Sequence, residues 1–67
     1  MNMENEIKER RRELGISQEE LAKICGVSRQ TVNAIENKKY DPTLGLAFHL
    51  AQALGTTVDA LFHPGQR

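Results

Sequence analysis

The sequence predicts an all-α domain of five short helices, and three observations lead to this prediction. Apolar residues recur at helical spacing, as at Leu44, Ala47 and Ala51. Capping residues and helix-ending glycines follow one another along the chain, and no strand-like alternation appears. At 67 residues the chain has room for one domain, residues 1–67, with an ordered core at about residues 4–62 and a tail at residues 63–67.

Charge is balanced over the chain but unevenly distributed. Nine basic residues offset nine acidic ones, for a formal net charge of 0. A protein that binds nucleic acid by electrostatics alone is basic overall, so the composition argues against that class. Between residues 26 and 40, however, the charges are Arg29, Lys38 and Lys39 against Glu36 alone. This distribution is compatible with one basic face on a neutral protein.

Several classes of protein are excluded by what the sequence lacks. Cys25 is the only cysteine and no Cys/His cluster occurs, so we predict no disulfide, no metal and no cofactor, and a small apolar role for Cys25. No nucleophile with its base and no carboxylate pair stands out in so short a chain, which predicts that the protein is not an enzyme. No secretory signal and no apolar run of ~20 residues is present, which predicts a cytoplasmic protein without membrane contact.

The first predicted helix covers residues 4–14. Its Glu, Lys, Arg and Leu residues favour helices, and Gly15 is suited to end it. Ile7 and Leu14 are seven residues apart and are therefore predicted to share a buried face. Arg10 or Arg11 lies between them, and an arginine on that face requires an acidic partner.

Residues 18–37 are predicted to form two short helices joined by a tight turn at residues 25–27. Ser17 and Glu20 have the spacing of a capping box ahead of the first of these helices. Gly26 permits the sharp turn, and the small Ala22 allows the second helix to cross the first closely. The predicted buried stripe of the first helix consists of Leu21, Ile24 and Cys25.

Ser28 is the predicted cap of the second helix, which extends from residue 29 to about residue 37. Val32 and Ile35 are predicted to face inward. The opposite face presents Arg29, Gln30 and Asn33. Polar residues on a helix are most often only solvated, but Arg29 suits guanine and Gln30 suits adenine in the DNA major groove. A helix with such residues directly after a tight turn favours a helix-turn-helix that reads DNA.

The fourth predicted helix covers residues 43–54, from the cap Thr43 to the stop at Gly55. No charged side chain occurs between residues 43 and 58. A helix that is apolar most of the way round is buried on more than one side. We therefore expect it either to lie at the centre of the domain or to face a partner as well.

A last short helix, residues 58–62 with Thr57 as its cap, completes the predicted fold, and His63 is expected in the tail. One short reading helix contacts only a few base pairs, so we predict a homodimer on an inverted-repeat operator. The predicted dimer interface consists of Phe48, His49, Gln52, Val58, Leu61 and Phe62. The same surface suits a second interpretation, an antitoxin or adaptor that holds a protein partner such as a toxin or another regulator.

The run GISQEELAKICGVSRQTVNAIENKKYDPTLG resembles the XRE-type family of phage-repressor and Cro-like helix-turn-helix proteins. The likeness extends from about residue 7 to residue 62 and is closest to small stand-alone bacterial and archaeal regulators. It implies a compact, lambda-repressor-like fold of five helices, with the helix-turn-helix at the second and third. It also implies a transcriptional regulator that binds double-stranded DNA.

The resemblance also implies roles for individual residues. Base contacts are implied for Arg29, Gln30, Thr31 and Asn33. Contacts with the DNA backbone are implied for Gln18, Ser28, Asn37, Lys38, Lys39 and Tyr40. An ion pair between Arg11 and Glu36 is implied as well, and it would tie the first helix to the third.

The sequence departs from the family at two places. Relatives commonly have glycine where this chain has Lys38, so we expect Asn37 to take the left-handed cap and Lys38 to add charge near a phosphate. Gly45, Phe48 and His49 stand where relatives often have more polar or charged residues. The fourth helix is therefore expected to offer a larger surface to a partner.

Overall fold

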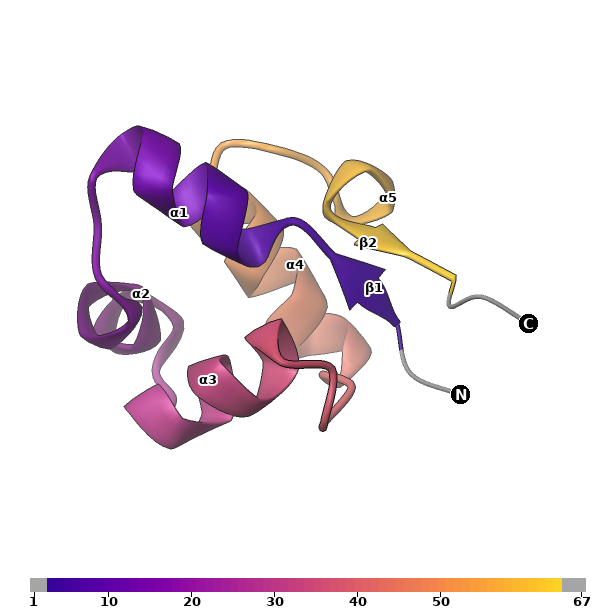
Figure 1. Ribbon diagram of the computed structural model, residues 1–67, viewed down its shortest axis with the longest axis horizontal. Coiled ribbons are helices and arrows are strands. Elements are labelled where there is room, and N and C mark those ends of the chain that lie inside the picture. Colours follow the sequence, from indigo (N-terminus) through magenta and orange to yellow (C-terminus); the bar gives the residue numbers. More distant parts are fainter. Residues whose placement is uncertain (1–2, 65–67) are drawn as a thin grey trace.

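The computed structural model describes residues 3–64, and this part of the chain contains five helices. They are α1 (Ile7–Leu14), α2 (Gln18–Cys25), α3 (Arg29–Glu36), α4 (Leu44–Ala53) and α5 (Val58–Leu61). Two short strands, β1 (Glu4–Asn5) and β2 (Phe62–His63), pair with each other (Figure 1). The predicted five-helix fold is confirmed, with the helix-turn-helix at α2 and α3. None of the described helices is long and apolar enough to cross a membrane.

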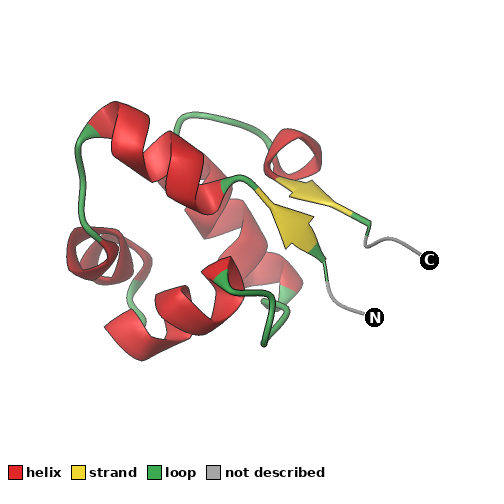
Figure 2. Ribbon diagram, in the orientation of Figure 1, coloured by secondary structure: helices red, strands yellow, loops and turns green. Residues whose placement is uncertain are grey.

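The predicted helix caps are present. The Ser17 hydroxyl accepts the Glu20 N–H at 3.0 Å, and the Glu20 carboxylate accepts the Ser17 N–H at 2.7 Å, which completes the capping box. The starts of α3, α4 and α5 are capped by the side chains of Ser28, Thr43 and Thr57. Gly26 has a φ of 71°, in the left-handed region that favours glycine, and ends α2 at the turn. These caps and turns set where each helix begins and ends, and Figure 2 shows the loops that connect the helices.

Every helix contributes to one apolar core. The side chains buried most completely are Ile7, Leu21, Val32, Ile35, Leu50 and Leu61. α4 packs against both α2 and α5, and Ala47, Leu50 and Ala51 supply its buried face. Ala22 is buried on α2, where its small side chain permits close packing. The charge-free α4 is therefore a central element of the domain.

Two apolar residues that we predicted to be buried, Leu14 and Ile24, are exposed instead, and so is Leu44 of the apolar fourth helix. Leu14, Ile24 and Leu44 are 54%, 62% and 70% exposed. Leu14 is the last residue of α1, and Leu44 is the first residue of α4. A small core does not extend to the ends of its helices, so an apolar residue there is exposed even on the inward face. The face of α2 that is covered includes Leu21 and Ala22, and Ile24 points about 100° away from its centre at helical spacing.

The two ends of the described chain are held together. The sequence predicted a helix from residue 4, no strands and a tail from His63, and these three predictions are wrong. Glu4 pairs with His63 and Asn5 with Phe62 in an antiparallel ladder, and α1 begins only at Ile7. Strands of two residues are too short to produce an alternating pattern. Of the predicted tail, residues 65–67 lie outside the described residues.

The predicted dimer interface requires a correction at two positions. Leu61 is fully buried and Phe62 is only 6% exposed, because both belong to the core. Their side chains are therefore unavailable to a second subunit. Phe48, in contrast, is 54% exposed, and His49 and Gln52 are exposed beside it on α4.

Candidate nucleic-acid interface

The N-terminal end of α3 presents its polar side chains to solvent. Val32 and Ile35 are 0% and 1% exposed, and they anchor the helix in the core. Arg29, Gln30 and Asn33 are exposed on the other side of the helix. Their hydrogen-bonding groups therefore lie on a helix whose opposite face is packed into the core.

Two hydroxyls at the start of α3 are occupied within the protein. Ser28 Oγ accepts the Thr31 N–H at 3.1 Å and lies 3.0 Å from Thr31 Oγ1. Thr31 is half-buried, whereas Arg29 and Gln30 are exposed. The geometry thus leaves Arg29 and Gln30 more accessible to an external ligand than Thr31.

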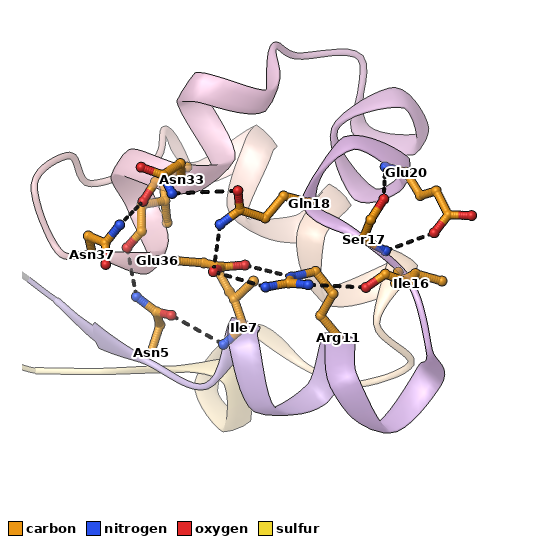
Figure 3. Close-up of polar contacts among 11 residues, drawn as sticks. Asn5, Ile7, Arg11, Ile16, Ser17, Gln18, Glu20, Asn33, Glu36 and Asn37 are labelled. Carbon is orange, nitrogen blue, oxygen red and sulfur yellow. Dashed lines mark hydrogen bonds and ion pairs between the residues drawn. The ribbon is translucent and has the colours of Figure 1, made fainter.

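An ion pair at the other end of α3 joins it to α1 (Figure 3). Arg11 Nε donates to Glu36 Oε2 at 2.8 Å, and Arg11 Nη2 donates to Glu36 Oε1 at 3.3 Å. Arg11 Nη1 also donates to the Ile16 carbonyl at 3.2 Å. The side chains of Arg11 and Glu36 are only 13% and 4% exposed. The arginine predicted on the apolar face of the first helix is Arg11, and Glu36 is its acidic partner.

Gln18 connects this ion pair to the exposed face of α3. Its Nε2 donates to Glu36 Oε1 at 3.0 Å, while its Oε1 accepts from Asn33 Nδ2 at 3.5 Å. Gln18 is the first residue of α2, and Asn33 is in the middle of α3. The network runs from Arg11 through Glu36 and Gln18 to Asn33, and it fixes the side chain of Gln18 between the two helices (Figure 3).

The turn after α3 differs from the expectation at Asn37. Asn37 has a φ of −91°, and Lys38 takes the left-handed conformation with a φ of 63°. The Lys38 N–H donates to the Ile35 carbonyl and the Lys39 N–H donates to the Ala34 carbonyl, at 3.0 and 2.9 Å. This bonding pattern requires a left-handed residue directly after the helix cap, which is the position of Lys38 and not of Asn37.

The polar groups of this turn are only partly free for a ligand. The Asn37 side chain donates to the Asn33 carbonyl at 3.0 Å. Lys38 Nζ lies 2.8 Å from Glu4 Oε1 of β1. Lys39 and Tyr40 are exposed. Among the residues predicted to contact the DNA backbone, Lys39 and Tyr40 thus have the side chains that are most accessible to a ligand.

Sequence reasoning missed the contribution of β1 to this region. Asn5 Nδ2 donates to the Ile35 carbonyl at 2.9 Å, and Asn5 Oδ1 accepts the Ile7 N–H at 3.2 Å. One side chain therefore joins the end of α3 to the start of α1, as seen beside Asn37 in Figure 3. No local pattern signals a contact between residues 30 positions apart.

Other chemistry is weakly represented in the described residues. No group of three His, Cys, Asp or Glu side chains among residues 3–64 is arranged to hold a metal ion. Partial burial raises the pKa of the Cys25 thiol above its ordinary value. The thiol therefore stays protonated at neutral pH, which fits a packing role.

Comparison with known proteins places this geometry in a family. A helix-turn-helix family model matches residues 7–61. An uncharacterized HTH-type transcriptional regulator of Methanocaldococcus jannaschii is 48% identical over 60 residues, which cover 90% of this chain and 91% of that protein.

Solved structures agree with this assignment. The DNA-binding domain of the P22 C2 repressor is similar, with a TM-score of 0.76 and 32% identity over 79% of this chain and 70% of that one. The hypothetical transcription factor NHTF from Neisseria has a TM-score of 0.78 and 38% identity over 90% of this chain and 69% of that one. The chain therefore belongs to the XRE-type helix-turn-helix family of DNA-binding transcriptional regulators and is not an enzyme.

Proposed function

We propose that this protein is a homodimeric, sequence-specific regulator that reads an inverted-repeat operator with α3. One observation carries the proposal: Arg29 and Gln30 are exposed at the start of a helix whose opposite side is anchored by Val32 and Ile35. The backbone of a helix packed in this way is already ordered, so inserting its first turn into the major groove costs ordering mainly of the contacting side chains. The likeness to the DNA-binding domain of the P22 C2 repressor supports the same use of the fold.

In this proposal Arg29 and Gln30 make the principal base contacts. Arg29 donates to the O6 and N7 acceptors of guanine, and Gln30 pairs with the N6 and N7 groups of adenine. Asn33 makes a secondary base contact together with Thr31, whose hydroxyl must share its bonding with Ser28. The network through Gln18 supports this arrangement, because it holds Asn33 from the protein side.

The DNA backbone is contacted from both sides of the reading helix. Gln18 and Ser28 contact phosphates near the start of α3, and the residues after α3 contact them near its end. This second group consists of Asn37, Lys38, Lys39 and Tyr40. Cationic contacts of this kind make binding fall steeply with salt concentration.

The dimer is proposed to form through the exposed face of α4. Phe48 is 54% exposed and Leu44 is 70% exposed on a helix with no charged side chain. His49, Gln52 and the half-buried Val58 lie at the same surface in this proposal. Two subunits related by a two-fold axis would place their reading helices about one helical turn, ~34 Å, apart.

The decisive experiment is selection of bound sequences from random duplexes. The proposal predicts an enriched inverted repeat with half-sites about one helical turn apart. Enrichment of no sequence above non-specific binding would refute sequence-specific recognition. Enrichment of a single half-site would refute the two-fold dimer.

The exposed face of α4 also favours a second candidate, an antitoxin or adaptor that holds another protein there. The discriminating measurement is light scattering on the purified chain. A stable homodimer that binds the selected duplex supports the first proposal. A monomer that fails to bind any duplex supports the second, because the apolar face then lacks an occupant.

A further inference from the structure

β1 brings an acidic side chain to the turn that follows the reading helix. Glu4 Oε1 lies 2.8 Å from Lys38 Nζ, and both side chains are nearly half exposed, at 42% and 47%. We propose that Glu4 limits the affinity of this protein for DNA, because its carboxylate competes with a DNA phosphate for Lys38. The inference rests on the proposed function, since it requires that the turn after α3 meet the DNA backbone.

Lys38 stands on a fixed backbone. The Lys38 N–H donates to the Ile35 carbonyl at 3.0 Å, and the Lys39 N–H donates to the Ala34 carbonyl at 2.9 Å. Ile35 is itself buried in the core. The ammonium group therefore moves only by side-chain rotation, within reach of either Glu4 or a phosphate beside α3.

Glu4 is held just as firmly. Its strand pairs with β2, and the Glu6 N–H donates to the Leu61 carbonyl at 2.9 Å. Asn5 attaches the strand directly to α3 through its hydrogen bond to the Ile35 carbonyl. Because the strand backbone is fixed, the Glu4 carboxylate stays within a side chain's length of the turn after α3 when Lys38 turns to a phosphate. DNA thus meets both the cation and its competitor.

The charge involved is a large share of this face. Between residues 26 and 40 the basic residues are Arg29, Lys38 and Lys39, and the acidic Glu36 is already paired with Arg11. Glu4 therefore offsets one of three cations. A carboxylate about 6 Å from a phosphate weakens binding about threefold in water, and opening an exposed ion pair adds up to about fivefold.

The test is a charge series at position 4, measured on the operator obtained by selection. Glu4→Gln is expected to tighten binding roughly threefold to fifteenfold for each subunit, and Glu4→Lys more. The slope of the logarithm of the binding constant against the logarithm of salt concentration is expected to steepen by up to about 0.9, because Lys38 then neutralises a phosphate without a competing Glu4 carboxylate and displaces a counterion from the DNA. Glu13→Gln, which removes the same charge from the exposed end of α1, is the matched control and should change neither quantity.

The background Lys38→Met separates competition from general repulsion. There, Glu4→Gln should tighten binding by less than in the wild type, because no cation remains to be released. An unchanged affinity for Glu4→Gln, or an equal gain with and without Lys38, overturns the inference. Absence of DNA binding by the wild type would instead overturn the proposed function. Thermal melts of each variant establish that the compared proteins are folded.

Discussion

Arg11 on α1 and Glu36 at the end of α3 form a two-point ion pair, with N–O distances of 2.8 and 3.3 Å. The two residues are 25 positions apart, and both side chains are largely buried. The guanidinium fork matches the carboxylate, which gives the pair a single orientation. α1 is therefore the support that sets where α3 ends and, through Gln18, how α2 meets it.

Removal of Arg11 should destabilise the domain strongly. Arg11→Met leaves the Glu36 carboxylate buried, with the Gln18 amide to donate to it. Breaking a buried pair from one side costs about 3 kcal/mol, which is a large share of the stability of so small a domain. Urea unfolding followed by circular dichroism measures the loss.

The control for this prediction is Arg12→Met, on the same helix but exposed. It should change the free energy of unfolding by no more than about 0.5 kcal/mol. If the two variants unfold at the same urea concentration, the pair contributes nothing beyond ordinary surface charge.

The left-handed Lys38 should be a point of backbone strain. An L-residue at a φ of 63° is disfavoured by about 1 kcal/mol relative to glycine. Lys38→Gly and Lys38→Ala both delete the ion pair with Glu4. The difference between the stabilities of the two variants therefore reports the cost of the left-handed backbone. We expect Lys38→Gly to be more stable than Lys38→Ala by about 1 kcal/mol in thermal unfolding. A difference of zero would mean that the turn relaxes to another conformation.

The sequence predicted the helices well where local chemistry determines them. Ser17, Ser28, Thr43 and Thr57 each form a helix cap through a side chain that bonds a nearby N–H, so a few neighbouring residues decide the start. The pair between Arg11 and Glu36 was expected from family resemblance, and the structure contains it. Spacing alone indicated only that an arginine on that face needed an acid.

The errors arise where distant parts of the chain meet. Asn5 and Phe62 lie near opposite ends of the described chain and pair with each other, and neither stands in a local sequence pattern that indicates a strand. Leu61 and Phe62 are core residues because that pairing folds the end of the chain inward. Helical spacing predicts on which face of the helix Leu14 and Leu44 lie. It does not predict how far along each helix the small core extends, and both residues lie beyond it.

Substitution at Arg29 should change which DNA sequence is preferred. Arg29→Ala removes the proposed guanine contact and should cost about 1–3 kcal/mol per half-site on the selected operator, with little change on random DNA. Competition binding against both duplexes measures the ratio. A preserved preference in Arg29→Ala would show that another side chain reads that base pair.

Lys39→Ala is the matched comparison for Arg29, because it removes one exposed positive charge from the turn after α3. It should weaken binding to all sequences alike and reduce the salt slope by about 1. The preference for the operator over random DNA should stay as in the wild type. Loss of that preference would assign Lys39 a base contact.

A charge on the exposed face of α4 should separate the subunits. Phe48→Glu places a carboxylate on the proposed dimer surface, in place of an apolar side chain that is 54% exposed, and each subunit of the dimer would carry one. Burying unpaired like charges should weaken dimerisation by at least about 2 kcal/mol. Sedimentation measures the dimer, and operator binding should fall in parallel because a monomer offers one reading helix.

Leu14→Glu provides the matched control for Phe48→Glu. Both residues are 54% exposed and both changes replace an apolar side chain by a carboxylate, but Leu14 lies at the end of α1 outside the proposed surface. Leu14→Glu should therefore remain dimeric and bind the operator normally. If both variants dissociate equally, net charge and not position controls association. If neither dissociates, the subunits meet elsewhere, and α4 keeps its apolar face for a different partner.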